Sequence, residues 1–294
     1  MLVSWANMLL WAAEVVYVIL AVRRMRWLAL AATGLTLAGW AMLAGGLVSR
    51  GLEAGHWPFV GRYEFPVCFA WAIVGVYLLL MLDWREPRLG PFVLVVALGV
   101  LGFALTRSSA ERAAVHLVPV LRSWWLFLHV ASAIAAYGAL GVGAGVGLLR
   151  LCQKEGASES LRASPLDAAH FPAGAPAGAH TGGKPGSLPP AVDAERMMDR
   201  CVTLGFPWLT FSILAGAIWA QNAWGRYWGW DPKEAWSLVV WLWFLLILHL
   251  RTLSAWRGRR LALLVLVGFG MVLFSFGGLP WLVRAVRLES LHGF

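Results

Sequence analysis

The chain has 294 residues, of which 60% are hydrophobic and only 13% are Asp, Glu, Lys or Arg. This composition, with a mean hydropathy of +0.70, excludes a soluble globular domain and indicates an integral membrane protein. The formal net charge of +9 suggests nucleic-acid binding at first sight, but the distribution of the basic residues along the chain argues against it.

Eight segments are long and apolar enough to cross a bilayer as helices, which takes roughly 20 residues. Their apolar character is continuous and lacks the alternation of a membrane barrel strand, so the sequence predicts an all-α fold. We therefore expect a polytopic membrane helix bundle with about eight transmembrane helices. The predicted spans are residues 2–22, 27–48, 66–82, 90–106, 124–151, 203–220, 233–252 and 261–279.

Basic residues gather in alternate connections between these spans. The connections 23–26, 83–89, 150–202 and 251–260 hold 15 of the 24 Lys and Arg residues. Because positive residues collect on the cytoplasmic side of membrane proteins, this bias predicts that both termini lie outside. The first span carries its arginines after the apolar run, which indicates an anchor rather than a cleaved signal peptide. The positive charge thus reflects topology and predicts no nucleic-acid partner.

One segment departs from membrane composition and divides the chain into three parts. It is rich in Pro, Gly, Ala and Ser and shows no apolar period, as flexible linkers do. We expect transmembrane helices 1–5 within residues 1–152, a flexible cytoplasmic linker at 153–200, and transmembrane helices 6–8 within 201–294. The residues just before the sixth span predict an amphipathic cytoplasmic lead-in to it.

The stretch "WGRYWGWDPKEAW" (224–236), called the tryptophan stretch below, concentrates aromatic side chains at a predicted membrane edge. Isolated Trp and Tyr residues at such edges are typical of any membrane protein, but that tendency explains this density poorly. Asp231 before Pro232 predicts a helix N-cap, and Glu234 suits the first turn of the helix. A flat hydrophobic ligand with ionisable edges fits such a platform: haem first, and a quinone or an aromatic substrate second. The aromatic candidates are Trp224, Tyr227, Trp228, Trp230 and Trp236.

Three histidines are candidate ligands for a haem iron. His129 lies near the outside end of the fifth span, and His292 lies outside, in the terminal "LHGF". His249 lies roughly 24 Å along the seventh span from Lys233, toward the cytoplasmic side. An intramembrane histidine is a functional candidate, and two imidazoles can hold one haem iron. His56 and His116 also lie outside and could compete for the same role.

The motif "AIWAQNAWGRYWGWDPKEAW" (217–236) resembles the tryptophan-rich WWD domain of haem-handling proteins. Its "DPKE" form is similar to the CcsA (ResC) family of System II cytochrome c biogenesis. Weaker matches to that family are "GRYEFPVCFAW" (61–71), "LHVASAIAAYG" (128–138), "LHLR" (248–251) and the terminal "LHGF" (291–294).

The resemblance implies a site and a reaction. His129 and His292 match the two external axial ligands of a haem b held by the WWD domain, whose residues here include Trp224, Tyr227, Trp228, Trp230, Asp231 and Trp236. His249 matches the transmembrane histidine at which haem enters. The implied activity is that of a haem lyase component, which presents haem for thioether attachment to a CxxCH apocytochrome c.

The resemblance also implies partners and a location. They are a CcsB (ResB) membrane protein, apocytochrome c, thioredoxin-like thiol reductants and membrane lipid, at the bacterial inner membrane with the haem site on the outer side. Two other functions remain open. One is a haem exporter or chaperone without lyase activity, and the other is a transmembrane haem subunit that transfers electrons.

Overall fold

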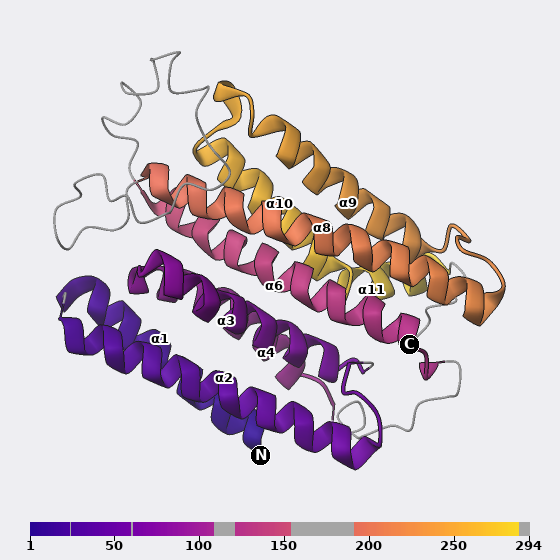
Figure 1. Cartoon of the computed structure of the whole chain (residues 1–294), viewed down its shortest axis with the longest axis horizontal. Coiled ribbons are helices and arrows are strands. Elements are labelled where there is room, and N and C mark those ends of the chain that lie inside the picture. The colour runs from indigo at the N-terminus through magenta and orange to yellow at the C-terminus, as the bar shows by residue number, and fades with distance from the viewer. Residues whose placement is uncertain (24, 60, 109–120, 154–190, 288–294) are drawn as a thin grey trace.

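The computed structural model describes residues 1–23, 25–59, 61–108, 121–153 and 191–287. All of its regular elements in these ranges are helices, as predicted, and they pack side by side as an elongated bundle (Figure 1). The helices are α1 (Leu2–Arg23), α2 (Arg26–Ala54), α3 (Glu64–Trp84), η1 (Pro87–Leu89), α4 (Gly90–Leu105), α6 (Trp124–Cys152), α8 (Ala191–Trp224), α9 (Pro232–Leu250), η4 (Ser254–Trp256), α10 (Arg259–Phe274) and α11 (Gly278–Ala285).

Seven of the described helices are long and apolar enough to cross a membrane, and α10 with α11 makes an eighth if the pair counts as one span. That pair corrects the continuous eighth span predicted at 261–279, because the two helices are bent by 57°. Pro280 cannot donate a backbone hydrogen bond, which disfavours continuation of α10 through it. Gly278 is also needed at the bend, since a Cβ there would lie 2.0 Å from Cδ2 of Phe274.

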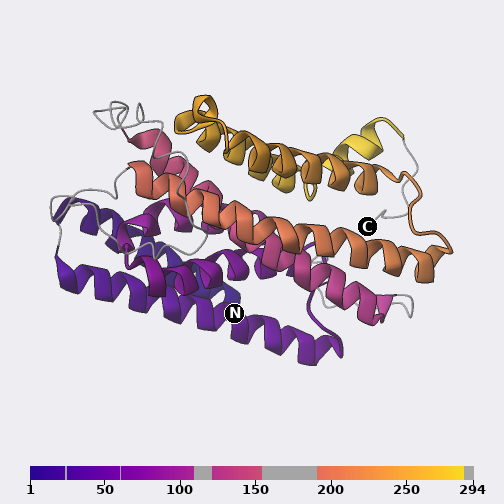
Figure 2. The ribbon, with the colours of Figure 1, turned by 45° about the horizontal axis from the view of Figure 1, so that its top comes forward.

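Helix α6 is the central element of the bundle and packs against α3, α4, α8 and α10. Its glycines let neighbouring backbones approach closely. A Cβ on Gly145 would lie 2.8 Å from the Phe92 carbonyl of α4, and one on Gly138 would lie 3.1 Å from the Ala72 backbone of α3. Small residues at such crossings are the usual means of packing helices in membranes. The helices α1 and α2 form a hairpin along one side of this core (Figures 1 and 2).

Ion pairs join the helices at the end of the bundle where we predict the cytoplasm. Arg150 at the end of α6 pairs with Glu195, and Arg200 pairs with Asp83 at the end of α3. In both pairs one residue, Glu195 or Arg200, lies in the first turns of α8. The predicted linker at 153–200 therefore ends earlier than expected, because residues 191–200 are helical. Residues 154–190 lie outside the described part of the chain.

Candidate functional site

The tryptophan stretch runs from the end of α8, through a short loop, into the first turn of α9. Gly225 ends α8 in the left-handed region with φ +75°, and its N–H donates to the Gln221 carbonyl at 2.9 Å. Trp230 also has a positive φ, +56°, which is costly for a side chain of this size. The conformation of the loop therefore needs support from its surroundings.

That support comes from the two acids of the stretch, which form a capping box at the start of α9. Asp231 is only 6% exposed, and its Oδ1 accepts from the Lys233 N–H at 2.9 Å. Glu234 Oε2 accepts from the N–H groups of Gly229 (2.7 Å) and Asp231 (3.3 Å). Two carboxylates thus tie the loop on both sides of Trp230 to a helix end, where the helix dipole also favours them.

The aromatic side chains of the stretch divide into an exposed set and an anchored set. Tyr227 and Trp230 are 61% and 71% exposed, and Trp228 lies edge-on to Trp230 with 5.8 Å between ring centroids. Trp224 instead packs edge-on against Trp219 of α8, at 4.9 Å. Trp236 donates from Nε1 to the Met271 carbonyl at 3.0 Å and contacts Phe274, which joins α9 to α10. A ligand from outside can therefore reach the first three rings.

His129 faces α8 from the first turns of α6. Its Nδ1 lies 2.7 Å from the backbone carbonyl oxygen of Ser212, which can only accept, so Nδ1 carries the proton and Nε2 carries the lone pair. The Ser212 hydroxyl donates to the His129 carbonyl at 2.9 Å. Gly216 makes room for the ring, since a Cβ there would lie 2.7 Å from Nδ1. This is the tautomer and support that a metal-binding imidazole requires.

The position of His129 relative to the tryptophan stretch follows from α8. Gly216 lies eight residues before Trp224, which is about 12 Å along the helix. The imidazole is therefore about two helical turns below the exposed aromatic rings. It is half-buried, and its level in the bundle lies between the loop and the middle of α8.

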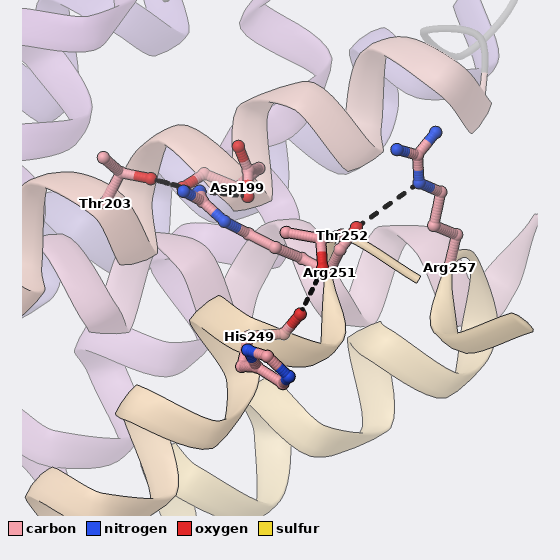
Figure 3. A network of polar contacts seen from close by, with 6 residues as sticks. All are labelled: Asp199, Thr203, His249, Arg251, Thr252 and Arg257. Carbon is pink, nitrogen blue, oxygen red and sulfur yellow. Dashed lines mark hydrogen bonds and ion pairs between the residues drawn. The ribbon is translucent and has the colours of Figure 1, made fainter. Parts of the chain in front are cut away.

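His249 is exposed on the outer face of α9, near the opposite end of the bundle. Figure 3 shows its ring pointing away from a polar network in which Arg251 reaches toward α8. Arg251 Nη1 contacts Asp199 Oδ1 and Thr203 Oγ1, both at 2.5 Å. Arg251 therefore binds a carboxylate of the chain itself, and His249 shares its exposed face with Val239, Leu242 and Leu246.

The other candidate histidines, and Glu64 of the 61–71 segment, have separate surroundings. His56 Nδ1 donates to the Trp57 carbonyl at 2.9 Å, in the connection between α2 and α3. Glu64 pairs with Arg50, whose guanidinium also lies 4.8 Å from the Tyr63 ring centroid. Glu64 therefore joins the end of α2 to the start of α3. His116 and His292 lie outside the described residues.

A sequence model of the family described as "Cytochrome C assembly protein" matches residues 60–286, which is most of the chain. The chain belongs to this family. Among its relatives, the cytochrome c biogenesis protein CcsA of Gloeobacter violaceus is 34% identical over 289 residues, covering 87% of this chain and 85% of the relative. CcsA of Synechococcus elongatus is 35% identical over 282 residues, covering 88% and 86%.

The fold of this assembly protein also resembles a solved structure, that of cytochrome c heme lyase CcmF. The TM-score is 0.61 at 14% sequence identity, and the alignment covers 98% of this chain. The chain spans about half the length of that lyase, since 48% of it is covered. At this identity the likeness shows a shared arrangement of helices. The hairpin of α1 and α2 lies outside the residues that the family model matches.

Three residues near the candidate site were not predicted from the sequence. Ser212 and Gly216 support His129, and their spacing of four residues on one helical face is the only sequence signal for them. Arg226 folds over the loop backbone, because a Cβ on Gly229 would lie 2.6 Å from its Nε. Arg226 therefore adds a cation beside the exposed aromatic rings.

Proposed function

We propose that this chain carries haem to the outer face of the bacterial cytoplasmic membrane and presents it there for covalent attachment to apocytochrome c. The observation that carries the proposal is the tryptophan stretch, an exposed aromatic surface fixed to the N-terminus of α9 by two carboxylates. Its rings can lie against a flat macrocycle. Arg226 supplies a positive charge at the edge, where carboxylates of the ligand would lie.

His129 suits the role of one iron ligand in this proposal. Its proton is held at Nδ1 by the Ser212 carbonyl, so its Nε2 lone pair is the one that can bind iron. His292 would supply the second external ligand, as the resemblance of the C-terminal "LHGF" implies. Haem b contributes the iron that these imidazoles bind and the two vinyl groups at which attachment occurs.

The reaction needs orientation more than a nucleophile from this chain. In thioether formation each cysteine sulfur of a CxxCH segment bonds to one vinyl carbon, and its hydrogen goes to the other, so the addition involves no net oxidation or reduction. Thioredoxin-like reductants would supply the thiols in reduced form. The chain contributes proximity and a fixed ring orientation, which can account for large rate effects. The acids Asp231 and Glu234 hold the loop that provides this orientation.

The position of His249 supports a partner of the CcsB type. An imidazole on the outer face of a membrane helix is poorly solvated by lipid alone. Val239, Leu242, Leu246 and His249 recur at helical spacing on one face, and the first three are 43–50% exposed. A transmembrane helix of the partner could cover this face and supply a second histidine, forming the entry site for haem.

The test is the visible spectrum of the full-length chain co-expressed with a CcsB-type partner, measured oxidised and reduced, together with haem staining of a CxxCH reporter protein. His129→Ala and His292→Ala should each convert a low-spin haem to high-spin or remove it, and abolish reporter staining. His249→Ala should reduce haem loading. Haem binding without any stained reporter favours an exporter or chaperone, and quinol-driven haem reduction favours an electron-transfer subunit. A wild type that binds no haem with its partner contradicts the proposal.

A further inference from the structure

A well-formed cavity lies away from the site described above. Its volume is about 870 Å³, and it lies between α2, α3 and the first half of α6. Residues 126, 127, 130, 131 and 134 of α6 line it, whereas His129 faces α8. At 100° per residue these lining positions centre about 130° around α6 from His129. The cavity is therefore not part of the proposed haem site.

The walls of this cavity are apolar over most of its length. On α2 it extends from Ala44 to Leu52, and on α6 from Leu126 to Ile134, which is about 12 Å along each helix. Aromatic rings close the end of the cavity next to the start of α6. There Phe127 packs against Trp57, Phe59 and Trp124, with ring centroids 5.4, 5.7 and 4.9 Å away. An occupant must therefore be long and apolar over most of its length.

The polar residues of the cavity collect at one end. They are Arg122 and Ser123 just before α6, and His56 just after α2, at the end of the bundle that carries the tryptophan stretch. Arg122 is exposed there, and none of the described lining residues is acidic. An apolar slot between membrane helices with a cation at its membrane-surface end complements an amphiphile with an anionic head.

We propose that this cavity binds an anionic phospholipid. Its acyl chain lies between α2 and α6, and its phosphate accepts hydrogen bonds from the Arg122 guanidinium. The bilayer supplies this ligand at high local concentration to a slot between transmembrane helices. The bound lipid joins the α1–α2 hairpin to the core on the side where the hairpin and α6 are separated by the cavity. It also supports the aromatic cluster around Phe127, two residues before His129.

The experiment is native mass spectrometry of the delipidated full-length chain with dioleoyl phosphatidylglycerol, compared with dioleoyl phosphatidylcholine. The wild type should bind phosphatidylglycerol more tightly. Arg122→Gln should weaken that binding about tenfold, as expected for one charge-assisted hydrogen bond, and should remove the preference between the two lipids. Ala131→Phe fills the slot and should weaken the binding of both lipids.

Two matched variants serve as controls. Arg107→Gln removes an arginine at the same end of the bundle, away from the cavity, where it lies over the Phe103 ring. Gly99→Phe places the same side chain on the exposed face of α4, where no atom lies within 4 Å of the built Cβ. The proposal is overturned if Arg122→Gln and Ala131→Phe both leave lipid binding unchanged. It is also overturned if the two control variants lower lipid binding as much as the cavity variants do. Haemin binding that Ala131→Phe abolishes, with lipid binding intact, would make the cavity a haem site and would also overturn it.

Discussion

Gly216→Ala tests whether α8 positions the His129 imidazole. The added Cβ would lie 2.7 Å from Nδ1 and 2.9 Å from Cε1, whereas ordinary contact begins at 3.4 Å, so the ring must move by about 0.7 Å (3.4 minus 2.7). That displacement is enough to lengthen the Nδ1 hydrogen bond to the Ser212 carbonyl, now 2.7 Å, beyond normal range. The bond that fixes the tautomer would then be weakened or lost.

The size of the effect on stability can be worked out separately. Alanine in a helix interior is favoured over glycine by about 1 kcal/mol, whereas forcing an extra methyl group into a packed site costs about 1–3 kcal/mol. The net change at Gly216 therefore runs from about zero to about 2 kcal/mol of destabilisation. Gly99→Ala on α4 is the matched control, because its Cβ meets open space and only the helix-favouring term remains.

The assay combines the haem spectrum with a thermal melt in detergent. Gly216→Ala should shift the haem from low-spin toward high-spin and lower reporter staining, with a melting temperature equal to or below that of the wild type. Gly99→Ala should leave the spectrum unchanged and melt at or slightly above the wild type. A wild-type spectrum in Gly216→Ala, with normal haem loading, would refute the reasoning that links α8 to an iron-binding His129.

Three further predictions follow from single contacts. Glu234→Ala removes the acceptor for two loop N–H groups. At about 1 kcal/mol for each hydrogen bond, this loss should lower haem affinity roughly 30-fold, as measured by equilibrium haemin titration. Glu53→Ala, at the exposed end of α2, is the control and should leave haem affinity unchanged. Trp236→Phe removes the donor to the Met271 carbonyl and should lower the melting temperature, with haem titration nearly unchanged. Asp199→Asn weakens the ion pair with Arg251 and should reduce haem loading, as His249→Ala should. The control Asp193→Asn, in the first turn of α8, should leave haem loading unchanged. Pyridine haemochrome quantification after co-expression measures both.

The transmembrane helices could be predicted closely because each is a continuous apolar run between charged connections. The predicted span 90–106 corresponds to α4 at Gly90–Leu105, and the predicted span 124–151 corresponds to α6 at Trp124–Cys152. The N-cap role of Asp231 was also predicted and is confirmed by its hydrogen bond to the Lys233 N–H. These features depend on local sequence: hydropathy over about 20 residues, or the order of Asp, Pro and Glu at a helix start.

The remaining features depend on contacts between segments that are distant in sequence. Ser212 supports a histidine 83 residues earlier, and Glu195 and Asp199 pair with arginines of other helices. Nothing in the local pattern around His129 indicates which helix its ring faces. The amphipathic lead-in predicted before the sixth span is the first part of α8, where Ala194, Met197 and Met198 are buried. Its pairing with the ends of α3 and α6 could not be predicted, because the arginine and acid partners are distant in sequence.

Helix α8 joins the two levels at which histidines of this chain lie. Asp199 and Thr203, near its beginning, hold the arginine that follows His249, and Ser212 and Gly216, farther along, hold His129. Thr203 and Ser212 are nine residues apart, which is about 14 Å along the axis. Pro207 lies between these two groups, where it removes one helical hydrogen bond without ending the helix. One helix, interrupted only at Pro207, thus supports the levels of both His129 and His249. A shift of either end of α8 would change the distance between these two histidines. The proposed transfer of haem from His249 to His129 therefore depends on this helix.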